Sequence, residues 1–400
     1  MKNRTGLGLA AAMMVWMTVQ AAWSYDPADP RTPDMYAIIF INGYAGDHFP
    51  QDLDQFEAVI KTCKEAGFNA VMTKYTDERA AILARHGMKL MVDLLVPGHH
   101  IYRDLEAVEE LAGRLQDSDV IYAYHLWSDR VGGQVAGRSR DIANMRRWDP
   151  NHPTYVGDYN ARTIHALENP DIIGFYDFHW TRGGFYPHLL RAMAAAKHHD
   201  VPFLKYAHAN PGRPGIGNFN RVMYTIAQST VFGLRGYMYH YPNADLLNLQ
   251  TAELGTIGRD CARVNHEIAP LGPELMKISN PIAVYSTPIT RTAKNDPVDP
   301  PAVPAGLTPV PDDFWVEIVS GELLVGDYRY GDNYGGAQAL LVANHNAYEP
   351  QTDVTLKPAA AFRRISLFDR AQGAWTELPV RNGTVTFSVP PAGIEMLKFE

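Results

Sequence analysis

The sequence predicts an α/β fold: a (β/α)₈ TIM barrel followed by a C-terminal antiparallel β-sandwich domain. Eight short apolar runs alternate with stretches whose apolar residues recur three and four positions apart, the pattern of parallel strands joined by crossover helices. After about residue 280, short alternating strands separated by turn signals replace this pattern. The expected divisions are a signal peptide at 1–24, a barrel at 25–278, and a sandwich at 279–400 with a Pro-rich insertion at 296–311.

The first 24 residues have the composition of a secretory signal peptide. Met1-Lys-Asn-Arg4 is positively charged, an apolar run from about Leu7 to Val19 follows, and small residues stand at Ala21 and Ala22. This apolar run is too short to remain as a bilayer-spanning anchor. The expected location is therefore secreted or periplasmic, without membrane attachment after signal removal.

The eight barrel strands are expected at 36–44, 69–75, 88–96, 120–127, 154–160, 171–180, 201–208 and 234–241. Helical spacing between them is clear in Leu105, Val108 and Leu115, and Gly67 and Gly87 are expected to end helices. A doubly wound open sheet is the alternative. It calls for a Gly-rich phosphate turn after the first strand, and residues 41–46 do not form one.

The sandwich strands are expected at 282–286, 314–320, 339–344, 364–368, 384–389 and 395–399. Asn382-Gly383 is a hairpin turn signal. Residues 296–311 contain six prolines. The prolines predict an irregular excursion in this segment.

Composition limits the class of partner. The net charge is -8 and no Lys/Arg block stands out, which does not favour nucleic acid. The only two cysteines, Cys63 and Cys261, lie on the apolar stripes of two predicted helices. Buried free thiols are the expectation, and a disulfide between the first and last barrel helices is the alternative.

Polar and aromatic residues gather where the fourth, fifth and sixth predicted strands end. The run 122–130 ends in His125, Trp127, Asp129 and Arg130, and the runs 154–160 and 171–180 also end in Asp beside aromatic residues. The working face of a TIM barrel is at the carboxyl ends of its strands. Because side chains alternate along a strand, residues two positions apart share one face of it, which gives one set of residues on each of two strands. They are Ala123, His125, Trp127 and Asp129 on the fourth strand, and Phe175, Asp177 and His179 on the sixth.

Asp129 and Asp177 are the candidate catalytic residues. Two carboxylates that face each other across a barrel mouth suit glycosidic bond cleavage, which needs one neutral carboxyl to protonate the leaving oxygen and one ionised carboxyl. The alternative for each is a helix N-cap or a partner of a neighbouring arginine. Asp158 fits a capping or supporting role equally well, and Asp93 is expected to be a buried hydrogen-bonding residue.

Aromatic and polar residues at the strand ends are the candidate substrate-binding residues, because flat rings beside polar groups suit sugar faces. They are Tyr44, His125, Trp127, Asp158, His179, Trp180, His208 and Tyr239. The several histidines at strand ends leave a metal site as an alternative. The first strand ends in Ile41-Asn-Gly-Tyr44 and lacks the His-x-His pair of barrel metallohydrolases, so no metal and no cofactor are expected.

These motifs resemble barrel glycoside hydrolases with a C-terminal β-sandwich. Tyr124-His-Leu-Trp-Ser-Asp-Arg130 is similar to the Tyr-Tyr-Leu-x-Asp-Glu-Pro stretch of clan A enzymes related to the family 42 β-galactosidases. The resemblance places Asp129 where that pattern has its acid/base Glu. Residues 147–153 and 234–240 are also similar to these proteins.

The chain departs from clan A on the seventh strand. Clan A has its nucleophilic Glu there, whereas Lys205-Tyr-Ala-His-Ala-Asn210 contains no carboxylate. Either Asp177 substitutes, in an arrangement resembling that of clan D α-galactosidases, or the protein has lost hydrolysis.

The expected function is an exported glycoside hydrolase that acts on an oligo- or polysaccharide. A non-catalytic glycan-binding barrel is one alternative, and a metal-dependent hydrolase that uses the histidines is another.

Overall fold

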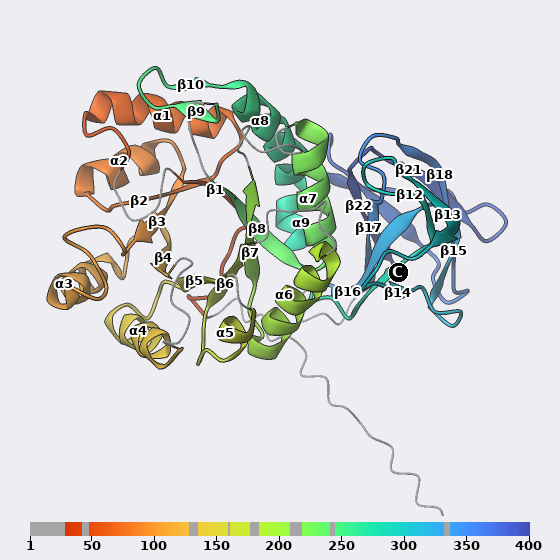
Figure 1. The fold of residues 1–400 in the computed structure, drawn as a ribbon, viewed down its shortest axis with the longest axis horizontal. Helices are drawn as coiled ribbons and strands as arrows, with labels where there is room; N and C mark the ends of the chain where they lie inside the picture. The colour runs from red at the N-terminus through yellow and green to blue at the C-terminus, as the bar shows by residue number, and fades with distance from the viewer. Residues whose placement is uncertain are drawn as a thin grey trace, which may run out of the picture.

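The computed structural model describes residues 29–41, 48–127, 135–158, 161–176, 184–208, 218–240, 245–331 and 337–400. Eight parallel strands close into a barrel in chain order, and a β-rich region packs beside it (Figure 1). The barrel strands are β1 (Ala37–Ile41), β2 (Ala70–Thr73), β3 (Lys89–Asp93), β4 (Ile121–Trp127), β5 (Thr154–Asp158), β6 (Ile172–Phe175), β7 (Phe203–His208) and β8 (Leu234–His240). Each lies within an expected run, so the predicted TIM barrel is confirmed.

Helices follow the strands and form the outer layer. They are α1 (Leu53–Glu65), α2 (Asp77–Arg85), α3 (Leu105–Leu115), α4 (Val135–Trp148), α5 (Ala161–His165), α6 (Phe185–His199), α7 (Phe219–Val231) and α8 (Thr256–Ile268), followed by η1 (Ala269–Leu271) and α9 (Gly272–Leu275). The side chains of Asp52, Thr76 and Asn218 accept backbone N–H bonds at the starts of α1, α2 and α7. Gly67 and Gly87 follow the ends of α1 and α2 with φ of 79° and 58°, as expected of helix-ending glycines.

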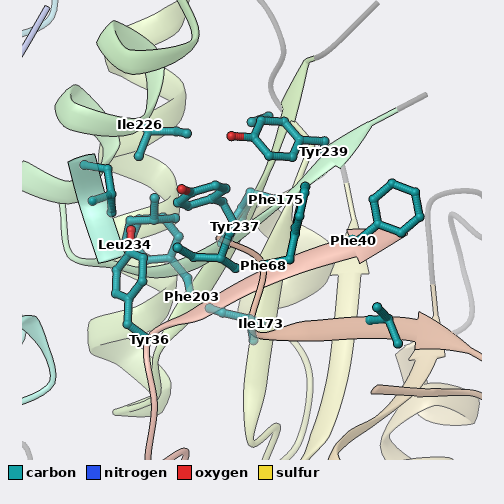
Figure 2. Packing of buried hydrophobic residues seen from close by; sticks show 14 of the residues in the cluster. Tyr36, Phe40, Phe68, Ile173, Phe175, Phe203, Ile226, Leu234, Tyr237 and Tyr239 are labelled. Atoms are coloured by element: carbon teal, nitrogen blue, oxygen red, sulfur yellow. The ribbon is translucent and has the colours of Figure 1, made fainter. Parts of the chain in front are cut away.

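Each barrel strand buries both faces. On β1, Ala37, Ile39 and Ile41 belong to the cluster inside the barrel, whereas Ile38 and Phe40 pack in the cluster between strands and helices. Figure 2 shows the cluster between strands and helices, to which several strands contribute aromatic rings. Since parallel sheets are covered on both sides, near-continuous apolar strands are what this architecture requires.

Tyrosines fill the barrel interior beside β5, β6 and β7. The rings of Tyr176 and Tyr206 stack with centroids 4.1 Å apart. A Cβ atom at Gly174 would lie 1.8 Å from the hydroxyl oxygen of Tyr155, and one at Gly157 would lie 2.9 Å from it. Glycine at these two inward positions therefore makes room for the tyrosine rings.

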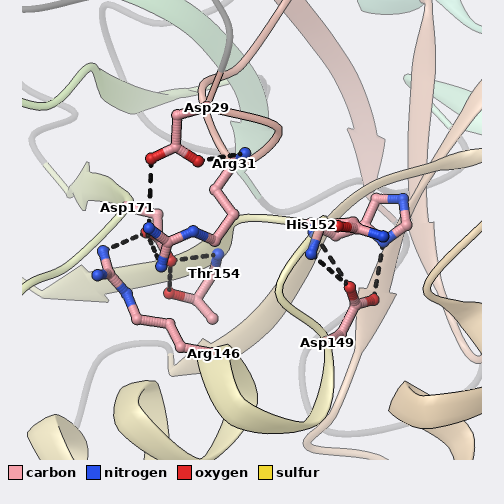
Figure 3. Close-up of polar contacts among 8 residues, drawn as sticks. Asp29, Arg31, Arg146, Asp149, His152, Thr154 and Asp171 are labelled. Carbon is pink, nitrogen blue, oxygen red and sulfur yellow. Dashed lines mark hydrogen bonds and ion pairs between the residues drawn. The ribbon is translucent and has the colours of Figure 1, made fainter. Parts of the chain in front are cut away.

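Ion pairs brace the amino-terminal ends of β5 and β6 (Figure 3). Asp171, just before β6, accepts hydrogen bonds from Arg146 of α4 at 2.5 Å and from the Thr154 hydroxyl at 2.7 Å. Asp149 contacts the Nδ1 atom of His152 at 2.7 Å. In TIM barrels this end of the strands contributes to stability, while the opposite end carries the working face.

The C-terminal region is a sandwich of two sheets. A seven-stranded sheet has the order β14-β11-β16-β17-β22-β19-β20 and a three-stranded sheet has the order β15-β18-β21, with a shared apolar core. Their bounds are β11 (Ala283–Ser286), β14 (Thr308–Pro309), β15 (Val316–Ser320), β16 (Leu323–Tyr330), β17 (Ala337–Asn344), β18 (Gln351–Pro358), β19 (Ile365–Asp369), β20 (Ala374–Glu377), β21 (Val385–Val389) and β22 (Ile394–Phe399). The six expected strands are confirmed, whereas β14, β16, β18 and β20 were not predicted.

The Pro-rich segment is more regular than predicted. Its first part forms β13 (Pro297–Ala302), which pairs antiparallel with β12 (Ile289–Arg291), and its end forms β14, which pairs with β11. The expectation of an irregular excursion is therefore wrong. Proline is tolerated here because β12 and β13 form a two-stranded ribbon, in which each strand leaves one edge without a ladder partner.

The sandwich is fastened to the barrel through α6 and α7, which face it in Figure 1. The Tyr328 hydroxyl contacts the last two carbonyl oxygens of α7 at 3.2 and 2.7 Å. The Gln228 amide donates to the backbone oxygen of Asn344 at 3.0 Å. The Tyr186 hydroxyl of α6 contacts the Nδ1 atom of His345 at 3.1 Å. All of these contacts are buried or half-buried, so the two parts share a specific polar junction.

Cys63 and Cys261 are free and buried, as expected. Burial raises the pKa of both thiols far above the usual range. Among the described residues, no helix combines the length and the apolar character needed to cross a bilayer.

Candidate functional site

The candidate site lies at the carboxyl ends of the barrel strands. Five of the predicted site residues fall outside the described part of the chain, and their roles stay predictions. They are Tyr44, Asp129, Asp177, His179 and Trp180. His208 ends β7, and its side chain is not described. The geometry of the site is therefore built from β3, β4, β5 and the loop that follows β3.

A buried carboxylate and imidazole meet at the ends of β3 and β4. Asp93 and His125 are register partners, and the Oδ1 atom of Asp93 lies 2.9 Å from Nδ1 of His125. The same oxygen accepts the N–H of Leu95 at 3.1 Å. The side chains are only 6% and 1% exposed. The predicted buried hydrogen-bonding role of Asp93 is confirmed.

This pairing fixes the chemistry of the His125 ring. An ionised carboxylate can only accept, so Nδ1 of His125 carries the proton that points to Asp93. The Nε2 atom is buried and has no hydrogen-bond partner among the residues that the structure describes. The ring lies against Tyr155 of the barrel interior, with centroids 5.5 Å apart. His125 therefore presents an uncommitted nitrogen inside the upper barrel, held in a defined tautomer.

Trp127 does not share the side of β4 that carries His125. The register between β4 and β5 shifts between these residues, since His125 pairs with Tyr155 and Trp127 pairs with Val156. The Trp127 ring instead packs toward α4, with the Arg138 guanidinium 4.5 Å above it. The expectation that strand alternation keeps His125 and Trp127 on one side is therefore wrong, because the irregularity inserts an extra residue into β4.

Asp158 forms an ion pair with Arg138 beneath the same end of the barrel. The two side chains meet at 2.6 Å, with Arg138 fully buried and Asp158 9% exposed. Asp158 has the strand parity of Val156, which packs among the helix-facing residues. The observed contact fits the supporting role more directly than substrate binding, which stays a prediction.

A second carboxyl group lies on α4 near Trp127. Asp141 is 2% exposed, and burial raises its pKa to about 6, against the opposing effects of the Arg140 charge and the Trp127 indole. The wall behind β4 thus contains both an ion pair and an acid that titrates in a mildly acidic range.

Tyr239 belongs to the core and not to the mouth. Its side chain is 0% exposed, and its hydroxyl donates to Oδ1 of Asn265 on α8 at 2.8 Å. Figure 2 shows the ring in the cluster that also contains Tyr237 and Phe68. The prediction that Tyr239 binds substrate is corrected, because it has the outward parity of β8 and its polar group is satisfied by α8.

At the end of the sixth strand, successive side chains face opposite sides of the barrel wall. Phe175 faces the helices, with its ring 6.0 Å from that of His188 on α6. Tyr176 instead stacks on Tyr206 inside the barrel. Asp177 and His179 lie outside the described residues, so their positions stay predictions.

The loop after β3 contributes residues that were not among the candidates. Backbone bonds from Leu94 to His125 and from Ile101 to Leu94 fold this loop against β4. Tyr102, 37% exposed, packs on Trp127 with ring centroids 4.6 Å apart. A pocket of about 450 Å³ opens beside it, with His100 on its wall. Local sequence gave little signal here, because the approach to Trp127 depends on the loop's fold.

Among the described residues, no group of three or more His, Cys, Asp or Glu side chains has an arrangement that could hold a metal ion. The metal-dependent alternative therefore has no described ligand set.

Comparison with known proteins identifies the fold. No protein-family model matches the sequence, and no curated protein matches it either. The chain is similar to the solved beta-galactosidase of Bacillus circulans sp. alkalophilus, with 9% identity over 92% of this chain and 99% of that one and a TM-score of 0.56. A structure described as a glycoside hydrolase has 12% identity, coverage of 91% and 92%, and a TM-score of 0.55.

A glycoside hydrolase family 5 protein from Bacteroides vulgatus has 13% identity, coverage of 91% of this chain and 89% of that one, and a TM-score of 0.54. These likenesses include the sandwich as well as the barrel, because the coverage extends over nearly the whole chain. At such low identity they show a common fold of barrel plus β-domain.

Proposed function

We propose that this chain is a glycoside hydrolase that cleaves a glycosidic bond in an oligo- or polysaccharide at the carboxyl-terminal mouth of its barrel. The carrying observation is the end-to-end correspondence of barrel and β-domain with a beta-galactosidase and two other glycoside hydrolases. The buried Asp93–His125 pair adds a preorganised polar group at the end of the barrel where such enzymes act.

Asp129 and Asp177 are the proposed catalytic carboxyl groups. Each stands two residues beyond the last residue of a barrel strand, Trp127 of β4 and Phe175 of β6. One protonates the leaving oxygen and the other acts as nucleophile or base. The chain needs no metal or other cofactor for this chemistry.

His125 is proposed to position substrate or a catalytic carboxyl group. Asp93 accepts a hydrogen bond from Nδ1, which leaves Nε2 of the ring to form a hydrogen bond with a sugar hydroxyl or a carboxyl group. Burial makes such a bond stronger than it would be in water, because no solvent competes for the acceptor.

Hydrolysis of a broad panel of polysaccharides and chromogenic glycosides tests the proposal. Asp129→Asn and Asp177→Asn are each expected to lower kcat on the order of 10²- to 10⁴-fold with sugar binding kept, the range for loss of a general acid or base. Asp117→Asn is the matched control, because Asp117 is exposed just after α3. Wild-type rates in both mouth variants would exclude this pair.

A non-catalytic glycan-binding barrel is the second candidate. The specific observation in its favour is that β7, whose counterpart carries the nucleophilic Glu in clan A, has no carboxylate in Phe203–His208. Calorimetry with the same saccharides, followed by chromatography after long incubation, separates the two functions. Binding with every saccharide recovered intact establishes the second candidate, and released products establish the first.

Export to the periplasm or the medium is part of the proposal, on the basis of the signal-like composition of residues 1–24. Expression of the full chain in a bacterial host and N-terminal sequencing of the product test it. A mature N-terminus near residue 25 is the expected result, and an intact Met1 in the cytoplasm contradicts it.

A further inference from the structure

Two cations without ion-pair partners stand at the carboxyl ends of β2 and β3. Lys74 directly follows β2, and Arg103 lies in the loop after β3. In the described part of the chain neither forms an ion pair, unlike Arg138, which is neutralised by Asp158. Unpaired cations are ordinary on an open surface, but Arg103 lines a pocket and Lys74 lies next to Gly98 of the same loop.

The pocket of about 450 Å³ has Leu95, Pro97, Gly98, His100, Arg103 and Asp104 on its walls. Lys74 is not on the wall but lies beside the same loop, since its Nζ atom is 3.8 Å from where a Cβ atom of Gly98 would be. The one acidic lining residue is already engaged, because Oδ2 of Asp104 accepts the backbone N–H groups of Gly98 and His100 at 3.0 and 3.2 Å. The wall therefore carries one cation, Arg103, and one committed carboxylate, Asp104, with the charge of Lys74 beside the loop.

The pocket adjoins the candidate site. Burial, and after it the Arg103 charge, lowers the pKa of His100, while the charges of Asp104 and Asp93 oppose this shift. His100 therefore lies within the fields of both the pocket cation and the carboxylate that holds His125. The rings of His100, Tyr102 and Trp127 form a row, with centroids 5.3 and 4.6 Å apart, that links the pocket to the end of β4.

A second imidazole contributes an unused polar atom. Within the described part of the chain, the Nδ1 atom of His99 is buried without a hydrogen-bond partner. Burial, and then the charges of Lys74 and Arg114, lowers the pKa of His99. Lys74, His99, His100 and Arg103 together thus surround the loop with hydrogen-bonding and cationic groups.

We infer that this pocket binds the anionic substituent of an acidic saccharide, and this inference rests on the proposed function. The substituent is either the carboxylate of a uronic acid or a sulfate ester. Arg103 on the pocket wall matches such an anion with two parallel N–H donors, and Lys74 adds a positive charge beside the loop. Tyr102 offers the adjoining sugar ring an exposed aromatic face. The net charge of -8 works against general attraction of polyanions, so recognition depends on this local pocket.

Binding of saccharide fragments to the full chain tests the inference independently of catalysis. The probes are polygalacturonate and alginate fragments for carboxylate, carrageenan fragments for sulfate, and galactan and mannan fragments as neutral sugars. The test variant is the double substitution Lys74→Gln with Arg103→Gln. Its matched control is Lys61→Gln with Arg191→Gln, which removes two exposed cations from the outer helices α1 and α6.

An acidic fragment is expected to bind the wild type and the control equally, and the test variant at least about tenfold more weakly, since each charged hydrogen bond contributes on the order of a tenfold change. The affinity of the wild type should also fall as salt rises. Whether uronate or sulfate fragments show this loss identifies the anion. Thermal melting of all variants within a few degrees of the wild type shows that folding is intact.

Equal binding of acidic fragments by test variant and wild type, or no binding of any acidic fragment, overturns the inference. Hydrolysis is measured on the same samples. If neutral fragments are hydrolysed and the test variant binds all fragments as the wild type does, the hydrolase proposal stands and the inference about the pocket is wrong. If acidic fragments bind the wild type more tightly than the test variant but are recovered intact, the inference about the pocket is supported and the hydrolase proposal is contradicted.

Discussion

Acid should loosen the junction between barrel and sandwich through His345. This residue directly follows β17 and is 1% exposed. Its Nδ1 atom contacts the Tyr186 hydroxyl of α6 at 3.1 Å, and Nε2 contacts the Ser286 hydroxyl of β11 at 2.9 Å. Burial lowers the pKa of His345 to about 3, so the ring is neutral in the folded protein above that pH.

The free energy of unfolding depends on this shift in a defined direction. An unfolded histidine titrates near 6.5, so between pH 6.5 and 3 the unfolded chain binds a proton that the folded chain does not. The contribution of neutral His345 is complete above pH 6.5 and is lost as the pH falls. With 1.36 kcal/mol per pKa unit, the loss at pH 4.5 is about 3 kcal/mol.

The assay compares His345→Gln with the wild type in urea unfolding at pH 7.5 and at pH 4.5, followed by tryptophan fluorescence. The variant keeps a polar side chain but cannot titrate, so its deficit in unfolding free energy relative to wild type should shrink by about 3 kcal/mol at the lower pH. His198→Gln, an exposed position on α6, should show no such change. The same deficit at both pH values would refute a buried neutral imidazole at this junction.

Three further substitutions test the barrel. Gly174→Ala should destabilise by about 1–3 kcal/mol in urea unfolding, because its Cβ would overlap a buried tyrosine oxygen, whereas Gly113→Ala on α3 meets no atom within 4 Å and should be neutral or stabilising. Asp141→Asn should stabilise the protein by up to about 3 kcal/mol at pH 8 and lose this gain below pH 4. The reason is that the pKa of Asp141 is raised to about 6, so its buried charge is unfavourable above that pH. Equal effects of the substitution at both pH values would contradict this reasoning. Asp93→Asn should lower kcat at least about tenfold through the wrong tautomer of His125, with melting little changed; unaltered kcat would show that the pair is only structural.

The elements of the barrel could be predicted because their signals are local. An apolar run or a helix-ending glycine such as Gly67 acts within one turn or strand, and the structure shows both where expected. The sandwich was predicted less completely. The strand β18 has exposed polar residues on its outer face, and β13 is rich in proline, so each is recognised only through the strand that pairs with it.

The contacts among the described polar residues at the strand ends could not be predicted from the sequence. The sequence located His125 and Asp93 at strand ends, but their 2.9 Å contact depends on the register between β3 and β4. Tyr239 was placed in the mouth because its position along the strand is right. Its direction is set by the alternation of β8, and its hydroxyl finds Asn265 on a helix that is distant in sequence.

The sequence by itself therefore determined the order of strands and helices, the barrel that follows from it, and the end of the barrel that carries polar groups. Tertiary structure alone decided which way those groups point. One register shift in β4 separates Trp127 from His125, and the fold of the loop after β3 brings Tyr102 onto Trp127. The physical reason is that side-chain direction has a period of two residues along a strand, so a single-residue irregularity reverses it while the local pattern stays the same.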